Sequence, residues 1–349
     1  MSAGPRRVVI PRYGGPGVLR IEPFVAADPG PQEVAIDVRA AGVNFADLYC
    51  RVGLYDAAPP VPFTPGFEVA GTVAAAGGRT RGFAPGQRVV GVTRFGGCAT
   101  RINLDAAWVR PLADAWSFAA GAGFPVVFLT AWYGLFEAGR LATGETVVVQ
   151  SAAGGVGMAA CQLARAAGAR VIGTVGSEAK RAAALAAGAQ EVVVAPRYDG
   201  WARIRELAGG DGVDVVLDAI GGRQLREAYR ALRPCGRLVT FGFAQMMPRR
   251  GPRNWPLLAW RYLRTPRFSP FGLVGRNRTV AGFNLVHLWR RPQLFDEALR
   301  QMLALADEGR IRPLPTTEIP FEDVARAHEL LQSRRTTGKI VLAVTADPS

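Results

Sequence analysis

One short run of residues constrains the fold of this chain more than any other. Residues 147–149 are all valine, and a cluster of glycines follows at Gly154, Gly155 and Gly157. Glycines at the start of a helix let the backbone turn sharply and approach a pyrophosphate, which the unpaired N–H groups of the first helical turn bind. The run therefore predicts a dinucleotide-binding turn, and a glycine-rich turn without a ligand is the alternative. The residues expected to hold the pyrophosphate are Ala153, Gly154, Gly155, Val156 and Gly157.

Predicted strands and helices alternate around this turn. Strands are expected at residues 146–150, 170–174, 191–194, 213–218, 237–241 and 279–283. Helices are expected at residues 125–137, 156–167, 178–187, 201–208, 223–231 and 292–308. Such alternation predicts βαβ units, a parallel sheet and right-handed crossovers.

The chain before and after this series has a different pattern. Residues 1–124 contain short strands broken by Gly and Pro, which is typical of an irregular β-rich domain. Residues 308–349 read as a helix followed by a strand, and we expect them to return to that first domain. The sequence thus predicts an α/β protein of two domains, one formed by residues 1–124 with 308–349 and the other by residues 125–307.

Composition narrows the class of protein. The formal net charge is +14, but nearly all the basic residues are arginines spread along the chain, so we expect no nucleic-acid partner. Lys180 and Lys339 are the only lysines, which suggests that a compact ammonium matters at both positions.

Four cysteines without a CxxC pair argue against a disulfide framework and indicate a reducing cytoplasm. No apolar run of about 20 residues stands out, so no membrane span is expected.

The end of the second predicted strand indicates which dinucleotide binds. An NAD enzyme usually places a carboxylate there for the ribose 2′-hydroxyl, and residues 173–177 contain none. Ser177, Lys180 and Arg181 offer instead a hydroxyl and two cations for a 2′-phosphate. Glu178 suits the first turn of the following helix, where a carboxylate complements the dipole. We therefore predict NADPH; a solvated helix face is the alternative role for the two cations.

Several motifs together resemble a known family. They are AGVNFADLY at 41–49, RVGLY at 51–55, PGFEVAG at 65–71, AAGGVGMAACQLA at 152–164 and GKIV at 338–341. These motifs resemble the zinc-free quinone oxidoreductases of the medium-chain dehydrogenase/reductase superfamily. GLYDAAPPVPFTPGFE and AGFNLVHL are similar to its vesicle amine transport protein branch.

The resemblance implies a fold and an activity. It implies a GroES-like β-rich catalytic domain, a Rossmann doubly wound domain and a cleft between them. There hydride passes from NADPH to an α,β-unsaturated carbonyl compound, a quinone or an enoyl thioester. A homodimer with neighbouring sheets joined edge to edge is also implied. The open alternatives are one-electron quinone reduction, a redox-neutral biosynthetic step, and a non-catalytic NADPH-binding protein.

The resemblance also indicates whether the protein binds a catalytic zinc ion. Zinc-dependent relatives use a histidine where Phe67 stands and a cysteine where Asn44 stands, and residues 94–101 lack a cysteine-rich lobe. Catalytic zinc needs three protein ligands, so no metal is expected. Glu68 is then interpreted as a buried acid satisfied by its neighbours.

Without a metal, reducing an activated alkene is easier than oxidising an alcohol, because the conjugated carbonyl delocalises the charge that hydride brings. The resemblance places Asn44 and Tyr49 at the nicotinamide end of the cleft, where either can donate a hydrogen bond to that charge. Asp47 completes the predicted catalytic set. In the alternative, Asn44 and Tyr49 only shape the pocket and Asp47 orders their loop.

On the cofactor side, the resemblance assigns five further positions. They are Thr130, Phe241, Gly242, Phe283 and Lys339. Relatives often carry an aromatic hydroxyl near the 2′-phosphate where this chain has Ala195 and Pro196, and Arg197 or Tyr198 is a candidate substitute.

Residues 248–278 interrupt the alternation with tryptophans and arginines. We favour a lid over the substrate or a contact with a second subunit. A peripheral membrane contact and docking of an acidic carrier protein are the less favoured alternatives.

Overall fold

The structure is a computed structural model that describes residues 4–196, 200–248 and 254–345. These residues divide into two compact units. Unit 1 contains residues 4–126 and 313–345, and unit 2 contains residues 127–248 and 254–312. The boundaries predicted from the sequence lie slightly earlier, after residues 124 and 307. Unit 2 extends to Arg312 because the Arg312 backbone N–H and C=O both bond the Gln162 side chain, at 2.8 and 3.2 Å.

Unit 1 is built on a seven-stranded sheet. Its main path runs in the order β14-β15-β3-β4-β5-β7, with β6 paired to β3, and β1 and β2 form a separate antiparallel pair. The tail of the chain joins this sheet, because β15 pairs antiparallel with β3 and parallel with β14. The strands are β1 (Arg6–Val9), β2 (Arg20–Pro23), β3 (Glu33–Val43), β4 (Glu68–Ala76), β5 (Arg88–Val92), β6 (Arg101–Asp105), β7 (Val109–Pro111), β14 (Thr316–Pro320) and β15 (Lys339–Ala343).

Unit 1 also contains helices that its Gly- and Pro-rich sequence did not predict. They are α1 (Phe45–Val52) and α2 (Phe118–Ala122); α11 (Val324–Gln332) is the expected helix of the tail. Asn44 caps the start of α1, and Gly53 caps its end with a φ of 71°, which suits the left-handed turn that closes the helix. A single eight-residue helix among strands carries too short a periodicity to stand out in the sequence.

Unit 2 contains a six-stranded parallel sheet in the order β10-β9-β8-β11-β12-β13. Numbered within the unit, this is the order 3-2-1-4-5-6 of a doubly wound nucleotide-binding sheet. The chain reverses direction across the sheet between β8 and β11, and ligands of such sheets bind at the carboxyl ends of the strands at that point. The strands are β8 (Thr146–Val149), β9 (Arg170–Val175), β10 (Glu191–Val194), β11 (Val213–Asp218), β12 (Leu232–Thr240) and β13 (Thr279–Gly282).

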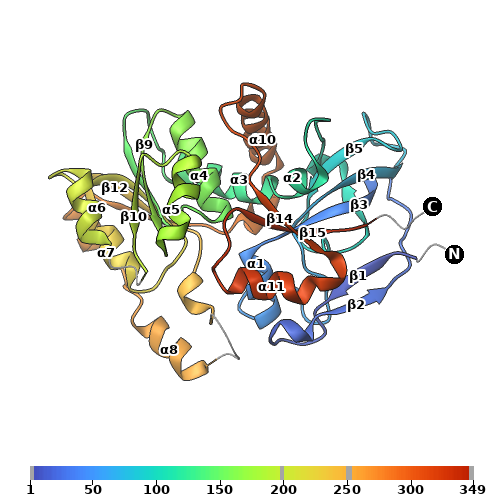
Figure 1. Cartoon of the computed structure of the whole chain (residues 1–349), viewed down its shortest axis with the longest axis horizontal. Coiled ribbons are helices and arrows are strands. Elements are labelled where there is room, and N and C mark those ends of the chain that lie inside the picture. Colours follow the sequence, from blue (N-terminus) through green and yellow to red (C-terminus); the bar gives the residue numbers. More distant parts are fainter. Residues whose placement is uncertain (1–3, 197–199, 249–253, 346–349) are drawn as a thin grey trace. The chain divides into compact units, whose positions relative to one another are not determined.

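Helices cover both faces of this sheet, as Figure 1 shows. Trp201 and Ile204 of α6 share one apolar cluster with Leu225 and Ala228 of α7 and with the sheet residue Val148. The helices of unit 2 are α3 (Pro125–Trp132, which begins in unit 1), α4 (Gly155–Ala166), α5 (Arg181–Ala186), α6 (Trp201–Ala208), α7 (Gln224–Ala231), α8 (Trp255–Leu263), α9 (Pro270–Val274) and α10 (Pro292–Asp307). The predicted α/β series is thus confirmed to within a few residues at each element.

The helix predicted at residues 125–137 belongs to a longer apolar helical segment, although the sequence predicted no apolar run of this length. Residues Phe118–Ala138 form a helical segment of 21 residues with the length and hydropathy of a membrane span. Within its most apolar window, 78% of the residues are buried inside the fold. A core helix of a folded domain passes the same test, and this degree of burial is what such a helix shows.

Candidate active site

The glycine turn adopts the backbone that a phosphate site needs. After β8 the chain passes through Ser151, whose φ of 55° is unusual for a residue with a side chain, and α4 begins after Gly154. A Cβ atom on Gly157 would lie 2.1 Å from the Ser151 carbonyl oxygen, so only glycine allows the helix to come this close to the loop. No side chain of the described residues caps the start of α4. The first N–H groups of a helix have no intrahelical partner, so without a cap they are suited to binding an anion.

Gln150 is a candidate site residue that the sequence analysis did not single out. It follows β8 at the point where the strand order reverses, and its backbone N–H bonds the Leu217 carbonyl of β11 at 3.2 Å. The side chain is 3% exposed, and its Oε1 accepts no hydrogen bond from the described residues. A buried carbonyl oxygen without a donor is unfavourable, so a ligand hydroxyl or amide at this position would satisfy it. A polar residue in the first position after the central strand is the signal that was available.

The predicted 2′-phosphate residues lie together after β9, but they are not equivalent. Arg181 donates to the Glu178 carboxylate and, at 2.7 Å, to the Val192 carbonyl. Ser177 is exposed at the start of the following turn. Lys180 is half-buried, and its desolvation lowers the pKa of the ammonium. Because Glu178 and the Val192 carbonyl already engage Arg181, we expect it to contribute less to a phosphate site than a free guanidinium would. Arg197 and Tyr198 lie outside the described residues.

The structure brings the predicted nicotinamide-side residues of unit 2 to one edge of the sheet. Phe241 and Gly242 follow β12, and Phe283 follows β13. The Phe241 and Phe283 rings stack with centroids 5.9 Å apart, and Tyr133 packs against Phe283 at 4.8 Å. A Cβ on Gly242 would lie 2.8 Å from the Ala219 carbonyl oxygen, so this turn also requires glycine. Thr130 is buried on α3 of the same unit.

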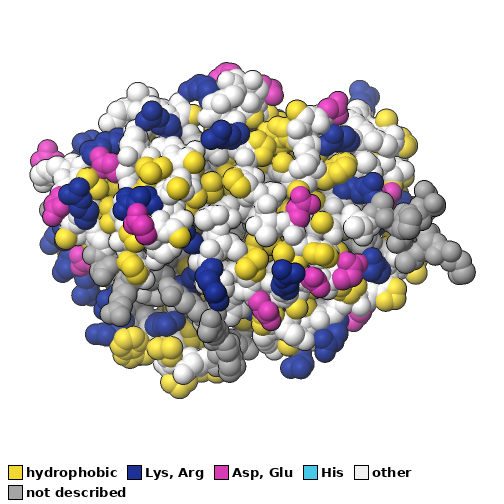
Figure 2. Space-filling view, in the orientation of Figure 1, with side chains coloured by type: hydrophobic (Ala, Val, Ile, Leu, Met, Phe, Trp, Pro, Cys, Tyr) yellow, Lys and Arg dark blue, Asp and Glu magenta, His cyan; other side chains and the backbone are white. Residues whose placement is uncertain are grey.

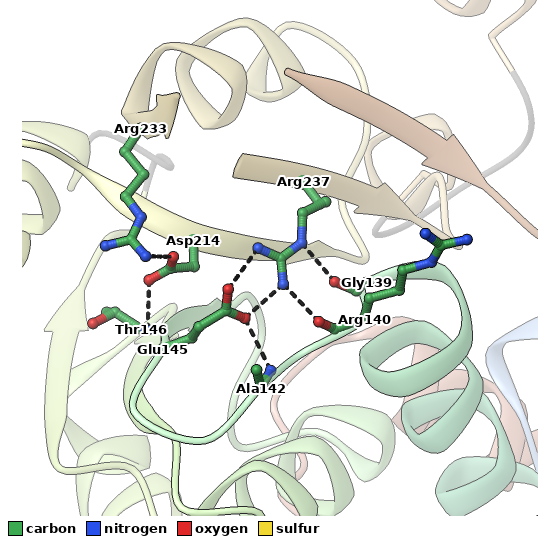
Figure 3. A network of polar contacts seen from close by, with 8 residues as sticks. All are labelled: Gly139, Arg140, Ala142, Glu145, Thr146, Asp214, Arg233 and Arg237. Carbon is green, nitrogen blue, oxygen red and sulfur yellow. Dashed lines mark hydrogen bonds and ion pairs between the residues drawn. The ribbon is translucent and has the colours of Figure 1, made fainter. Parts of the chain in front are cut away.

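Ion pairs occupy the opposite end of the same sheet (Figure 3). Arg237 bonds the Glu145 carboxylate at 2.5 and 2.9 Å and the carbonyls of Gly139 and Arg140 at 2.7 and 2.8 Å. Burial tends to raise the pKa of Glu145, but the hydrogen bonds from Arg237 and Ala142 and the charges of Arg237 and Arg233 together outweigh it, so the pKa falls below its usual value. Nearby, Asp214 accepts the Thr146 N–H and pairs with Arg233. The ion pairs and the predicted ligand residues are therefore at different ends of unit 2.

In unit 1, a buried ion pair holds the predicted catalytic residue Asn44. The Lys339 ammonium donates to Asn44 Oδ1 at 2.6 Å, Glu68 Oε1 at 2.8 Å and the Val43 carbonyl at 2.8 Å. Asn44 Nδ2 donates to the same Glu68 oxygen at 2.9 Å, and the second Glu68 oxygen accepts the Val126 N–H at 2.8 Å. Glu68 is fully buried and Lys339 is 3% exposed. The interpretation of Glu68 as a satisfied buried acid is confirmed.

This geometry changes the role expected of Lys339. All three of its ammonium protons are donated within unit 1, so the geometry favours a positioning role, through Asn44, over the predicted direct contact with the cofactor. Two glycines make room for the pair. A Cβ on Gly42 would lie 2.4 Å from Glu68 Oε1, and one on Gly123 would lie 3.1 Å from Lys339 Cγ.

Asp47 is placed as a structural carboxylate. One of its oxygens accepts the Asn44 N–H at 2.8 Å, and the other accepts the Gly66 N–H at 2.8 Å. Burial raises the pKa of Asp47 to about 7, while these two amide hydrogen bonds and nearby Lys339 oppose the rise. The carboxylate thus links the start of α1 to the loop before β4. This geometry agrees with the alternative role predicted for Asp47, in which it orders its own loop.

Tyr49 is half-buried on α1, and its ring packs edge-on against Phe45 at 5.4 Å. Phe67, at the histidine position of zinc-dependent relatives, packs in an aromatic cluster with Tyr55 and Phe95. Among the described residues, no three His, Cys, Asp or Glu side chains lie close enough to hold a metal ion. The zinc-free expectation stays a prediction.

Comparisons with known proteins agree with this arrangement. The family "Alcohol dehydrogenase GroES-like domain" matches residues 30–114, and the family "Zinc-binding dehydrogenase" matches residues 155–305. The synaptic vesicle membrane protein VAT-1 homolog of Rattus norvegicus is 35% identical over 97% of this chain and 83% of its own length. The Escherichia coli quinone oxidoreductase complexed with NADPH superposes with a TM-score of 0.84 at 31% identity, covering 97% of this chain and 99% of that one. CurK enoyl reductase superposes with a TM-score of 0.84 at 26% identity, covering 98% and 99%.

Proposed function

Because the chain belongs to the medium-chain dehydrogenase/reductase superfamily, in the branch of the quinone oxidoreductases and VAT-1 homologues, we propose that it is an NADPH-dependent, zinc-independent reductase of α,β-unsaturated carbonyl compounds. Quinones and enoyl thioesters are the related acceptors. The observation that carries the proposal is the carboxyl edge of the unit 2 sheet. There the glycine turn, the orphaned Gln150 oxygen and the paired Phe241 and Phe283 lie together, as a dinucleotide requires.

The residues of unit 2 fit NADPH on separate grounds. The uncapped N–H groups at the start of α4 suit a pyrophosphate, and Ser177 with Lys180 suits a 2′-phosphate. The absence of a carboxylate from residues 173–177 disfavours NADH. The NADPH complex of the Escherichia coli relative supports the same choice.

Bound NADPH supplies a hydride. The roles that remain for the side chains of unit 1 are to bind the acceptor, to stabilise the negative charge that develops on it and to help a proton reach it. We propose that the Tyr49 hydroxyl donates a hydrogen bond to the acceptor's carbonyl oxygen, where negative charge develops. Glu68, Lys339 and two backbone amides hold the polar atoms of Asn44 and Asp47, which suits these two residues to positioning roles. Asn44 instead fixes the start of α1 and so the position of Tyr49. The proton that completes the reduction can come from water.

The donor set of unit 1 supports a reaction without zinc. Phe67 has no donor atom, and the Lys339 ammonium occupies the oxygens of Asn44 and Glu68 that a metal would need. A bound cation at this point would meet a positive charge. Metal content of the purified protein, measured by plasma mass spectrometry, should therefore be far below one zinc per chain.

A panel of enones, quinones and enoyl thioesters tests the proposed activity. We expect NADPH oxidation, followed at 340 nm, with stoichiometric formation of the saturated product and no radical signal. A semiquinone signal in electron paramagnetic resonance would favour one-electron quinone reduction. NADPH binding without turnover on any acceptor would refute the reductase proposal in favour of a binding protein, and substrate conversion without NADPH loss would indicate a redox-neutral enzyme.

We also propose a homodimer. Strand β13 ends the described order of the unit 2 sheet, so its outer edge is available for pairing with a second copy. Sedimentation equilibrium of the full chain tests this, and a monomer at micromolar concentration would contradict it. A cytoplasmic location stays a prediction.

A further inference from the structure

The exposed apolar side chains of the described chain are concentrated in one segment of unit 2. Eleven large apolar side chains are exposed, and eight of them lie between Phe243 and Val274. Helix α8 alone exposes Trp255, Leu257, Trp260, Tyr262 and Leu263. Figure 2 shows these hydrophobic side chains gathered at the lower edge of the view, where Figure 1 places α8, with basic side chains beside them.

Helix α8 gains little from packing on its own unit. Of its nine residues, only Leu258 is buried. Helices in proteins are normally held by burying one face, and nine residues alone are too few to form a stable helix in water. The short helix α9 is similar, since Phe271 is 91% exposed and Val274 is 83% exposed. The described residues leave the apolar side chains of both helices largely exposed, so another surface would have to cover them.

The charge of the segment identifies that surface. Residues 254–278 contain five arginines and no acidic residue. Arg264 lies over the Trp260 ring at 4.6 Å, and Arg267 and Arg276 are exposed. Aromatic rings flanked by arginines match the boundary of an anionic lipid layer, where rings enter the headgroup region and guanidinium groups meet phosphates.

We propose that α8 and α9 form a docking surface for membranes that contain anionic lipids. At 1.5 Å per residue, α8 is roughly 14 Å long, about half the thickness of a hydrocarbon core, so it lies on the membrane and does not cross it. The same face of a second copy is a poorer partner, because two arginine-rich faces without acidic residues repel each other. A lid is also a poorer explanation, because a lid buries its apolar side chains and α8 buries one.

Co-sedimentation of the full chain with vesicles tests the proposal. We expect binding to phosphatidylcholine vesicles that contain phosphatidylglycerol, little binding to phosphatidylcholine alone, and release at high salt. Replacing Arg264, Arg267 and Arg276 by Gln should weaken binding about fivefold for each arginine at low salt. The triple variant Trp260→Ser/Leu263→Ser/Phe271→Ser should weaken it at least about tenfold. In the parent chain, Trp255 and Trp260 fluorescence should shift to the blue when vesicles are added.

The control variants carry the same kinds of substitution at exposed positions outside α8 and α9. Val25→Ser/Leu185→Ser removes exposed apolar side chains, and Arg203→Gln removes an exposed arginine of α6; neither should alter vesicle binding. Absence of binding to anionic vesicles, or equal binding by all variants, would overturn the proposal. So would a loss of dimer in the apolar variant, which would assign the face to a second copy. Altered acceptor selectivity without vesicle binding would assign it to a lid. Binding is measured without NADPH or acceptor, so its failure leaves the proposed reductase function unaffected.

Discussion

The two units of this chain use a glutamate–cation pair in different ways. In unit 2, Glu145 and Arg237 lie at the amino end of the sheet, opposite the glycine turn, and their side chains remain 19% and 15% exposed. In unit 1, Glu68 and Lys339 are buried and bond directly to the predicted site residue Asn44. Stabilising contacts and predicted site residues are thus separated in unit 2 and joined in unit 1. Substitutions should reveal this difference.

The largest effect is expected from Lys339→Met. The change leaves the Glu68 carboxylate buried without its cation, which typically destabilises a protein by about 3–5 kcal/mol. Denaturant unfolding should show this loss. Because Asn44 also loses a hydrogen bond, the kcat of any surviving enzyme should fall while the KM for NADPH changes little. The double variant Lys339→Met/Glu68→Gln should recover much of the stability, since the amide keeps partners for Asn44 and Val126.

The opposite result for Lys339→Met would be informative. Near-normal stability with a large loss of NADPH affinity would show that Lys339 contacts the cofactor, as the family resemblance implies. The positioning role would then be wrong.

Arg237→Met tests the separated pair in unit 2. It removes the cation of a partly exposed carboxylate and the bonds to two carbonyls, so we expect a loss of about 2 kcal/mol in the free energy of unfolding. NADPH affinity should stay within about twofold, because the pair lies at the other end of the sheet. The pKa of Glu145 is lowered in the fold, so the pair's contribution is present above the ordinary value of 4.5 and is lost as pH falls through the folded pKa. The variant should lack this part of the acid dependence.

Arg170→Met provides a matched control for Arg237→Met. Arg170 bonds Glu191 and the Leu207 carbonyl near the sheet edge, with its side chain 38% exposed, and its loss should have a smaller effect. A fall in NADPH affinity with Arg237→Met, at unchanged stability, would contradict the separation of the two ends.

The sequence predicted the two units unequally, for physical reasons. In unit 2, regular alternation and the glycine run predicted every strand, because each element repeats a periodicity that the sequence carries. In unit 1, α1 was not predicted because it is a short helix among short, irregular strands. The contact between Lys339 and Glu68 was not predicted either, because the two residues are 271 positions apart and their contact depends on β15 pairing with β3. The same limit applies to the bond from Arg181 to the Val192 carbonyl, because it depends on β9 and β10 lying side by side.

His328 should make the stability of unit 1 depend on pH. It is fully buried in α11, burial and the nearby Arg51 lower its pKa to about 3, and neither ring nitrogen is hydrogen-bonded within the described residues. In the unfolded chain a histidine binds its proton below about pH 6.5. Unit 1 should therefore lose stability as pH falls below 6.5, by about 2 kcal/mol at pH 5. His328→Phe keeps an aromatic ring of similar size and should remove this loss.

The pH experiment must compare the parent chain and the variant at each pH. Asp47 and Asp218 have pKa values raised by burial, to about 7 and about 6, so their protonation favours the fold as pH falls. These contributions are common to both proteins and cancel in the difference. Parallel acid curves for the parent and His328→Phe would show that His328 takes no part in the acid sensitivity of unit 1.

The variant Ser177→Ala/Lys180→Gln, at the carboxyl end of the unit 2 sheet, should have the smallest effect on stability. Its effect on NADPH binding should be large. If these side chains hold the 2′-phosphate, NADPH should bind about 10- to 30-fold more weakly while NADH changes little, because charge-assisted bonds to the phosphate are lost. The melting temperature without cofactor should stay unchanged, which is the signature of a binding region separate from the stabilising one. Arg181→Gln is the control with a small effect on NADPH, since Glu178 and the Val192 carbonyl already engage its guanidinium. Equal losses for both cofactors would place the phosphate elsewhere, and a lower melting temperature would show that stability and binding overlap in unit 2 as they do around Asn44.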